Sequence, residues 1–241
     1  MAWILLHASR SYWETHFVSI PKRESEGEKL APKAVVGRLS LYLRQLETFH
    51  RQGLTTVSSN QLGAPLSIKN AQVRKDLAFF GQFGHPGVGY RIDELIPALR
   101  RVIGIDREWP LALVGVGNLG SALLKYRGFR SRGFQIAALF DNDPRKIGQK
   151  LDGLVVEPLD AIRKAVAFKK ISLAILCVPA EPAQRVADHL VACGIQGILN
   201  FAPVPLIVPP SVSIMAIDLS VQLENLAYKV LRTRDGISFA G

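Results

Sequence analysis

The first regular pattern of apolar positions lies between residues 34 and 49, where apolar side chains recur at steps of three and four positions. This spacing predicts an amphipathic helix that ends before Gly53. Ser58 and Gln61 then have the spacing of a capping box, in which each side chain accepts a hydrogen bond from the other residue's backbone amide. A short second helix is therefore expected to begin at this serine.

A third helical pattern runs through residues 72–80. Val73, Leu77 and Phe80 share one face, so that face can dock on the first helix while the opposite face stays free. The glycine-rich residues 81–92 predict a tight β-ribbon. Three helices followed by a ribbon are typical of a winged helix-turn-helix domain. A small helical cap on a dehydrogenase is the alternative that this pattern leaves open.

After an amphipathic stretch at residues 93–103, short apolar runs alternate with helical segments. The predicted strands span residues 111–116, 135–140, a short run near Leu154, 171–178, 197–199 and 212–217. The predicted helices begin at Asn118, follow Pro144, and span residues 159–168 and 182–193. This alternation predicts an α/β domain with a Rossmann-like, doubly wound parallel sheet.

A last amphipathic helix follows Asp218, whose side chain can cap it. Such a terminal helix can cover its own sheet or reach a partner subunit, and the pattern fits both. We expect an extension at residues 1–33, a winged-helix domain at 34–104, a linker at 105–110, an α/β domain at 111–217, a C-terminal helix at 218–232 and a tail at 233–241.

A G-x-G-x-x-G turn joins the first strand of the α/β domain to its first helix. In a dinucleotide site, the first glycine allows a tight turn, the second lets the backbone approach a pyrophosphate, and the third lets the helix pack on the strand. The helix N-terminus adds unpaired N–H groups and the positive end of a dipole. The residues expected to bind NAD(H) along this turn are Gly115, Val116, Gly117, Asn118, Leu119 and Gly120.

Asp141 ends the second strand of the α/β domain. Its carboxylate can accept both hydroxyls of an adenosine ribose and would repel a 2′-phosphate, which favours NAD(H) over NADP(H). Arg145 and Lys146 lie close to it in the sequence and keep NADP(H) open as an alternative.

Three further residues follow later strands and are expected in the cofactor site, because ligands of such sheets bind outside the carboxyl ends of the strands. They are Val178, Pro179 and Asn200. Asn200 has two interpretations: it orients the nicotinamide amide or a ribose, or it satisfies the backbone of its own loop. Cys177 and Cys193 have no metal-ligand spacing, so structural burial is expected for both and no metal site is expected.

The composition of the chain is that of a globular protein without a membrane-spanning segment. Of the 241 residues, 48% are hydrophobic and 21% are charged, as in an ordinary globular protein. No apolar run is long enough to span a membrane, and the first residues do not resemble a signal peptide, so a cytoplasmic protein is expected. The net charge is +10, and residues 33–91 carry eight basic and two acidic side chains. This segment favours a polyanionic partner, with a solvated basic face as the alternative.

The predicted third helix carries polar and basic residues away from its apolar face. In a winged helix this element enters the major groove, where Arg or Lys pairs with guanine and Gln with adenine. The ribbon would lie along the backbone or the minor groove. The residues expected to contact double-stranded DNA are Ser58, Ser59, Lys69, Gln72, Arg74, Lys75 and Tyr90.

In order along the chain, these motifs resemble those of the bacterial redox-sensing transcriptional repressor family Rex. The resemblance covers about residues 32–231 and rests on Gln72-Val73-Arg74-Lys75-Asp76-Leu77, Phe83-Gly84 with Gly87-Val88-Gly89-Tyr90, the glycine turn, and Gly197-Ile198-Leu199-Asn200-Phe201-Ala202-Pro203. It implies a homodimer whose C-terminal helices are exchanged between subunits. It also implies that NADH favours release of operator DNA, whereas NAD+ permits binding.

The resemblance further implies that Arg44, Tyr126 and Asp218 communicate between the cofactor, the partner subunit and the DNA-binding domain. We expect Asp218 to pair with Arg44 across the dimer in one state and to contact Tyr126 in the other. The alternative is that Tyr126 is a half-buried packing residue and Arg44 a solvated one.

Two other functions remain to be weighed. An NAD-dependent dehydrogenase needs a general acid or base near the hydride, but the second half has a single histidine, His189, within a helical pattern. No histidine with a carboxylate partner stands out, so the chain is not expected to be an enzyme. The other alternative is a regulator whose sheet binds a different adenine-containing ligand, such as coenzyme A.

Overall fold

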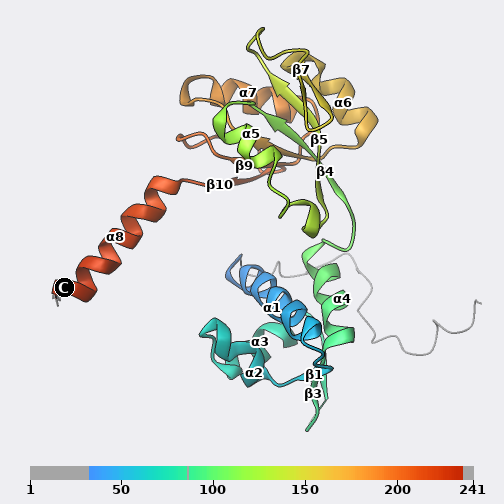
Figure 1. The fold of residues 1–241 in the computed structure, drawn as a ribbon, viewed down its shortest axis with the longest axis vertical. Coiled ribbons are helices and arrows are strands. Elements are labelled where there is room, and N and C mark those ends of the chain that lie inside the picture. The colour runs from blue at the N-terminus through green and yellow to red at the C-terminus, as the bar shows by residue number, and fades with distance from the viewer. Residues whose placement is uncertain (1–32, 86, 236–241) are drawn as a thin grey trace, which may run out of the picture. The chain divides into compact units, whose positions relative to one another are not determined.

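In a computed structural model, the described part of the chain comprises residues 33–85 and 87–235. Residues 1–32 of the expected extension and 236–241 of the expected tail lie outside this part, whereas residues 233–235 of the tail belong to the last helix. The chain divides into two compact units, residues 1–106 and 107–241, and Figure 1 shows a helical unit and a sheet-containing unit. The division falls within the expected linker.

The first unit is built mainly from helices. They are α1 (Lys33–Arg51), α2 (Ser59–Gly63), α3 (Asn70–Ala78) and α4 (Ile92–Ile103), with a 3₁₀ turn (Ala64–Leu66) between α2 and α3. The capping box at α2 is confirmed, because the Gln61 amide donates to Ser58 Oγ at 3.2 Å and the Ser58 amide donates to Gln61 Oε1 at 2.8 Å. Buried side chains of α1, including Leu39, Leu43 and Leu46, form the centre of this core.

A three-stranded antiparallel sheet completes the first unit. Its strands β1 (Thr56–Val57), β2 (Gly84–His85) and β3 (Gly89–Arg91) lie in the order β1-β3-β2. The ribbon formed by β2 and β3 is confirmed. The sequence pattern did not predict β1, because it has two residues and is defined only by pairing with β3, where Val57 lies opposite Tyr90.

The second unit contains a seven-stranded sheet. Its strands are β4 (Trp109–Val114), β5 (Phe134–Asp141), β6 (Lys150–Leu151), β7 (Leu154–Pro158), β8 (Leu173–Leu176), β9 (Gly197–Asn200) and β10 (Ser213–Ala216). The spatial order is β10-β9-β8-β4-β5-β7-β6, and the strands pair in parallel except for β6 with β7. The order of strands therefore reverses between β4 and β8, which is where doubly wound sheets bind their ligands.

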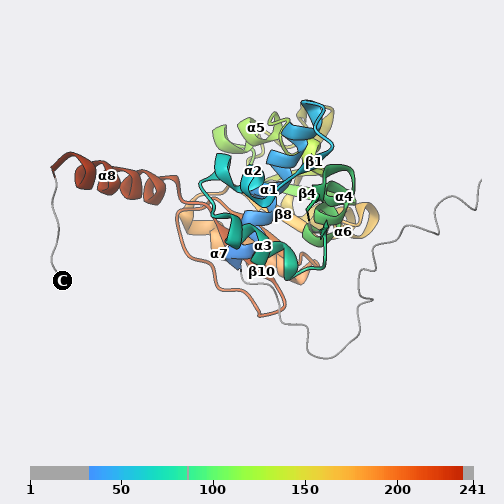
Figure 2. The same ribbon diagram turned by 90° about the horizontal axis from the view of Figure 1, so that it is seen from below.

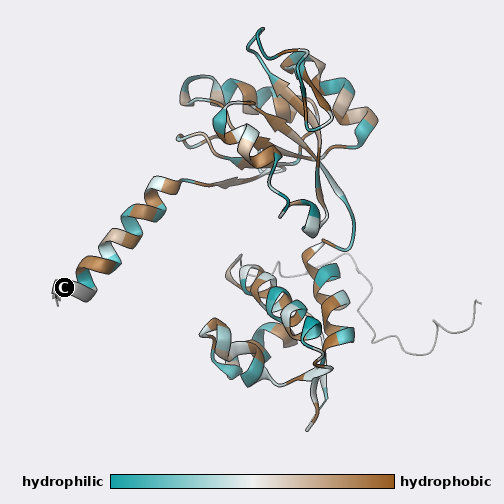
Figure 3. Ribbon diagram, in the orientation of Figure 1, coloured by the Kyte–Doolittle hydropathy of each residue, from teal (hydrophilic) through white to brown (hydrophobic). Residues whose placement is uncertain are grey.

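Both faces of this sheet are covered. The intervening helices are α5 (Asn118–Leu124), α6 (Ile162–Lys169) and α7 (Ala180–Ala192). Along β4, Ala112 and Val114 pack with residues of α6 and α7, whereas Leu111 and Leu113 pack with residues of α5. The central strands are accordingly hydrophobic along much of their length in Figure 3, as expected for strands buried on both faces.

One expected helix and several element boundaries differ from the expectations. The prediction of a helix after Pro144 is wrong, because the segment is a turn. In this turn, Asp143 Oδ1 accepts a hydrogen bond from the Arg145 amide at 3.0 Å, and Gly148 adopts a positive φ of 86°. These local bonds replace a helical ladder and lead the chain into β6. In addition, β4 begins at Trp109 rather than Leu111, because Trp109 and Pro110 already lie opposite β5 residues.

The final helix, α8 (Leu219–Asp235), begins after Asp218 as expected and ends three residues beyond the predicted end at residue 232. The amides of Ser220 and Val221 donate to Asp218 Oδ1 at 2.9 and 3.2 Å, which confirms the cap. Figure 2 shows α8 outside the sheet, and the described side chains of this helix are exposed. Within the described part of the chain, none of the helices has the length and hydropathy of a membrane span.

Candidate functional site

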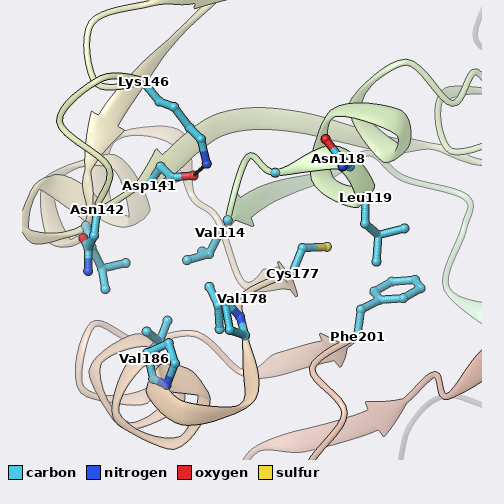
Figure 4. Close-up of a pocket in the computed structure, with 15 residues that line it drawn as sticks. Val114, Asn118, Leu119, Asp141, Asn142, Lys146, Cys177, Val178, Val186 and Phe201 are labelled. Carbon is cyan, nitrogen blue, oxygen red and sulfur yellow. Dashed lines mark hydrogen bonds and ion pairs between the residues drawn. The ribbon is translucent and has the colours of Figure 1, made fainter.

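A cavity of about 510 Å³ lies where the strand order reverses, at the carboxyl ends of β4 and β8. Cofactor pockets have volumes of this size. In Figure 4, Asp141 and Lys146 lie at one end, Leu119 and Phe201 lie at the other, and Cys177 lies between them. The lining residues are Val114, Gly115, Gly117, Asn118, Leu119, Asp141, Asn142, Lys146, Leu159, Cys177, Val178, Pro179, Pro182, Val186 and Phe201.

The three glycines of the turn after β4 serve different purposes. Gly115 has a positive φ of 91°, and a Cβ there would lie 2.5 Å from the carbonyl oxygen of Cys177. A Cβ at Gly120 would overlap the carbonyl group of Gly115, so close packing of α5 on the strand requires glycine. A Cβ at Gly117 would meet no protein atom within 4 Å. The protein itself therefore requires two of the glycines, while the third leaves open space beside the cavity.

Asp141 is held firmly at the end of β5. Its Oδ2 accepts the Val116 amide at 2.8 Å and Lys146 Nζ at 3.0 Å, and its Oδ1 accepts the Asp143 amide at 2.9 Å. Burial alone would raise the pKa of Asp141, but the donors from Asp143 and Lys146 outweigh it and hold the pKa below its usual value. The carboxylate is therefore ionised at neutral pH and fixed between the glycine turn and the turn after β5.

Most of the residues predicted for the cofactor site line the cavity, including Asp141, Val178 and Pro179. Val116 and Gly120 do not line it and act through the backbone of the turn.

Asn200 requires a correction. It is fully buried, it is not among the lining residues, its Nδ2 donates to the carbonyl oxygens of Ala202 and Val204, and its Oδ1 accepts the Ala202 amide. It therefore satisfies its own loop, which was the second of its two interpretations, and this loop carries Phe201 into the cavity lining.

Sequence reasoning missed several lining residues, above all Phe201 and Cys177. Each follows directly on a residue at the end of a strand at the carboxyl edge, and that position was the signal that could have found them. Burial raises the pKa of Cys177 to about 12, so its thiol stays protonated. The cysteine therefore contributes apolar surface rather than a reactive thiolate.

In the first unit, α3 and the turn before it present a basic surface. Lys69, Arg74 and Lys75 are exposed, and Arg74 Nη1 donates to Ser59 Oγ at 3.2 Å. Ser59 belongs to α2, so the structure brings together predicted DNA contacts from two helices. Ser58 is half-buried and its hydroxyl is used by the capping box.

A buried carboxylate that the sequence did not reveal lies behind this surface. Asp76 is 2% exposed, and it accepts hydrogen bonds from Arg38 Nε at 2.6 Å, Arg38 Nη2 at 2.8 Å, the Tyr42 hydroxyl at 2.8 Å and Gln72 Nε2 at 2.6 Å. Burial alone would raise the pKa of Asp76, but the Arg38 guanidinium and the Tyr42 hydroxyl hold it below its usual value. This cluster ties α3 to α1.

Two residues that were predicted to contact DNA make contacts inside the first unit instead of lying free on its surface. Gln72 is half-buried and one of its amide hydrogens is directed to Asp76, so it is a positioning residue for α3 as well as a candidate base contact. Tyr90 is 8% exposed and lies in the core of the first unit, where burial raises its pKa. Tyr90 therefore packs the ribbon against the helices rather than standing on the surface.

The three residues expected to couple the sites are all exposed within their own units. Arg44 lies on the exposed side of α1. Tyr126 is 59% exposed and packs edge-to-face on Phe129, with 5.1 Å between the ring centroids. Asp218 caps α8.

Two protein-family models match the chain, one in each unit. The model described as "Putative DNA-binding protein N-terminus" matches residues 31–78, and the model described as "CoA binding domain" matches residues 106–204.

Similar proteins extend over nearly the whole described chain. The redox-sensing transcriptional repressor Rex of Carboxydothermus hydrogenoformans is 47% identical over 201 residues, which are 83% of this chain and 97% of that protein. A crystal structure of RSP in complex with beta-NAD+ and operator DNA has a TM-score of 0.81 and 34% identity, and covers 86% of this chain and 95% of that one. A crystal structure of RSP in complex with beta-NADH has a TM-score of 0.77 and 33% identity, and the match covers 86% of this chain and 97% of that one. The chain therefore belongs to the Rex family of redox-sensing transcriptional repressors.

Proposed function

We propose that this protein is a transcriptional repressor that responds to the ratio of NADH to NAD+ and releases operator DNA when NADH binds. The observation that carries the proposal is that one chain holds a dinucleotide-type cavity at the reversal of a parallel sheet and a separate helical unit with an exposed basic helix. The relatives are repressors rather than enzymes, so a dehydrogenase with a helical cap is not favoured.

The cavity residues fit a dinucleotide along its length. The backbone of Gly115 and Gly117 would hold the pyrophosphate, and Asp141 would hold the adenosine ribose. The opposite end, formed by Leu119 and Phe201, would receive the nicotinamide ring. Because NAD+ and NADH share every other part, only this end can tell them apart. Its apolar side chains favour the neutral reduced ring over the cationic oxidised one, since a charge is costly in apolar surroundings.

The response to NADH is a matter of linkage between two sites. The chain can release DNA only to the extent that NADH binds more tightly to the arrangement that does not bind DNA. A tenfold to hundredfold loss of DNA affinity corresponds to roughly 1.4 to 2.8 kcal/mol, within the usual range of coupling free energies.

We propose that the functional form is a homodimer in which α8 is exchanged between subunits. Leu219, Leu223, Leu226 and Val230 recur at helical spacing and are each more than half exposed in the single chain. An apolar stripe of this kind marks a protein interface, and a second copy of the same chain supplies a symmetric partner.

The experiment that tests the proposed function is a gel shift on genomic fragments at fixed salt. Operator DNA should stay bound with NAD+ and be released by NADH. Coenzyme A is included because the CoA-binding family model matches the second unit. If coenzyme A released the DNA and NADH did not, the proposal would be replaced by a coenzyme A-responsive regulator.

We also propose that the protein works in the cytoplasm, where bacterial operator DNA and the NADH pool meet. Fractionation of cells that express the chain should recover it with the cytoplasmic proteins, and recovery in another fraction would contradict this location.

The proposed coupling residues lead to a prediction about Asp218. We propose that its carboxylate pairs with Arg44 of the other subunit in one state and with Tyr126 in the other. Asp218→Asn keeps a side chain that can cap α8 but removes the charge, whereas Asp218→Ala removes both. Both variants should bind operator DNA with little or no response to NADH. If the Asn variant responds like the wild type and only the Ala variant fails, the cap rather than the charge is responsible.

A further inference from the structure

Asp141 and Lys146 form one unit at the ribose end of the cavity. Both residues line it, and Figure 4 shows them together at the end opposite Leu119 and Phe201. Lys146 Nζ lies 3.0 Å from Asp141 Oδ2, and the side chain of Lys146 is 33% exposed and that of Asp141 11% exposed, so the carboxylate is largely shielded from water while the ammonium group keeps some access to it. Among the described lining residues, Asp141 is the only acid and Lys146 the only base.

The hydrogen bonds already made by Asp141 limit what it can offer to a ribose. A carboxylate has about four acceptor positions. Val116 and Lys146 occupy both positions on Oδ2, and the Asp143 amide occupies one on Oδ1. About one position remains, so Asp141 can accept one ribose hydroxyl while this arrangement lasts. The second hydroxyl then lies near the ammonium group, which has N–H donors left.

The charge at this end differs from that of a lone carboxylate. A lone aspartate repels a 2′-phosphate, and this repulsion is the usual basis for preferring NAD(H). The ammonium group of Lys146 cancels the charge of Asp141 and can donate directly to phosphate oxygens. The neighbouring cation, Arg145, cannot take this part: its side chain is 88% exposed, it is paired with Asp143 at 2.9 Å, and it does not line the cavity.

We propose that Lys146 determines how strongly the pocket discriminates between NADH and its 2′-phosphorylated form, by keeping a cation against the carboxylate that contacts the ribose. This inference rests on the proposed function, because it assumes that the cavity binds a dinucleotide. A lysine that only supported the fold would affect both dinucleotides equally. The turn itself does not need the side chain, since the Lys146 amide donates to the Asp143 carbonyl at 2.9 Å.

The test compares the dissociation constants of NADH and NADPH for the full-length protein and three variants, measured by energy transfer from tryptophan to the reduced nicotinamide. In Lys146→Met, the constant for NADPH should rise by about tenfold more than that for NADH, as expected when a charge-assisted bond to phosphate is lost. Lys146→Arg keeps a cation at this position, so the ratio of the NADPH dissociation constant to the NADH dissociation constant should stay near that of the wild type. Arg145→Met is the matched control and should leave both constants unchanged.

If Lys146→Met left the ratio of the two dissociation constants unchanged, whether or not both affinities fell, the inference would be overturned while the proposed function stands. Failure of the wild-type protein to bind NADH would instead overturn the proposed function.

Discussion

Asp76→Ala is expected to destabilise the first unit by about 3 kcal/mol and to abolish specific DNA binding. The substitution removes a 2% exposed carboxylate that accepts four hydrogen bonds from α1 and α3. The Arg38 guanidinium, the Tyr42 hydroxyl and the Gln72 amide would lose their shared acceptor, and the Tyr42 hydroxyl would be left unpaired in the core. Hydrogen exchange of the α1 and α3 amides in the full-length protein measures the effect.

Asp93→Ala is the matched control, because Asp93 belongs to an exposed ion pair with Arg91 that contributes at most about 1 kcal/mol. Tyr42→Phe removes one of the four hydrogen bonds, so its loss of hydrogen-exchange protection in α1 and α3 should lie between those of Asp76→Ala and Asp93→Ala. If the hydrogen-exchange protection of α3 in Asp76→Ala equalled that of the wild type, the cluster would not be what fixes α3 on α1.

The same cluster predicts a dependence on pH. The pKa of Asp76 is lower in the folded protein than the value of about 3.9 in an unfolded chain. Its contribution to stability is therefore complete above that pH and is lost as the pH falls through the folded pKa. Asp76→Asn should show a smaller loss of α3 protection than the wild type over this acid range.

Gly117→Ala is expected to weaken NADH binding by at least about tenfold and leave the fold unchanged. An added Cβ meets no protein atom within 4 Å, yet it would occupy the space into which the backbone admits a pyrophosphate. Thermal unfolding and NADH titration together test this. The variant should still bind operator DNA, and NADH at the concentrations that act on the wild type should no longer release it.

Gly120→Ala is the comparison variant, because its Cβ would overlap the Gly115 carbonyl and strain the contact between α5 and β4. It should lower the unfolding temperature as well as NADH affinity. If Gly117→Ala bound NADH normally, the glycine turn would not be the pyrophosphate site.

The local features of this fold could be predicted from the sequence. The Ser58–Gln61 capping box, the glycine turn and the cap at Asp218 depend on residues within a few positions of one another. The alternation of strands and helices also sufficed to predict the parallel part of the sheet, and with it the edge at which Asp141 lies, but not the antiparallel edge strand β6.

The remaining features depend on contacts between distant residues. The burial of Asp76 could not be predicted from its own helix, because its partners Arg38 and Tyr42 are 38 and 34 positions away in the sequence. Likewise, Asn200 stands at the edge where ligands bind, and only the hydrogen bonds to its own loop reveal that its amide is already used.

Reciprocal linkage between NADH and operator DNA can be measured on the wild-type protein at fixed salt. The factor by which saturating NADH raises the dissociation constant of operator DNA should equal the factor by which saturating operator DNA raises that of NADH, and both should be about tenfold or more. An operator affinity that is the same with NADH, with NAD+ and without either would contradict the proposal that the cavity controls the DNA-binding unit.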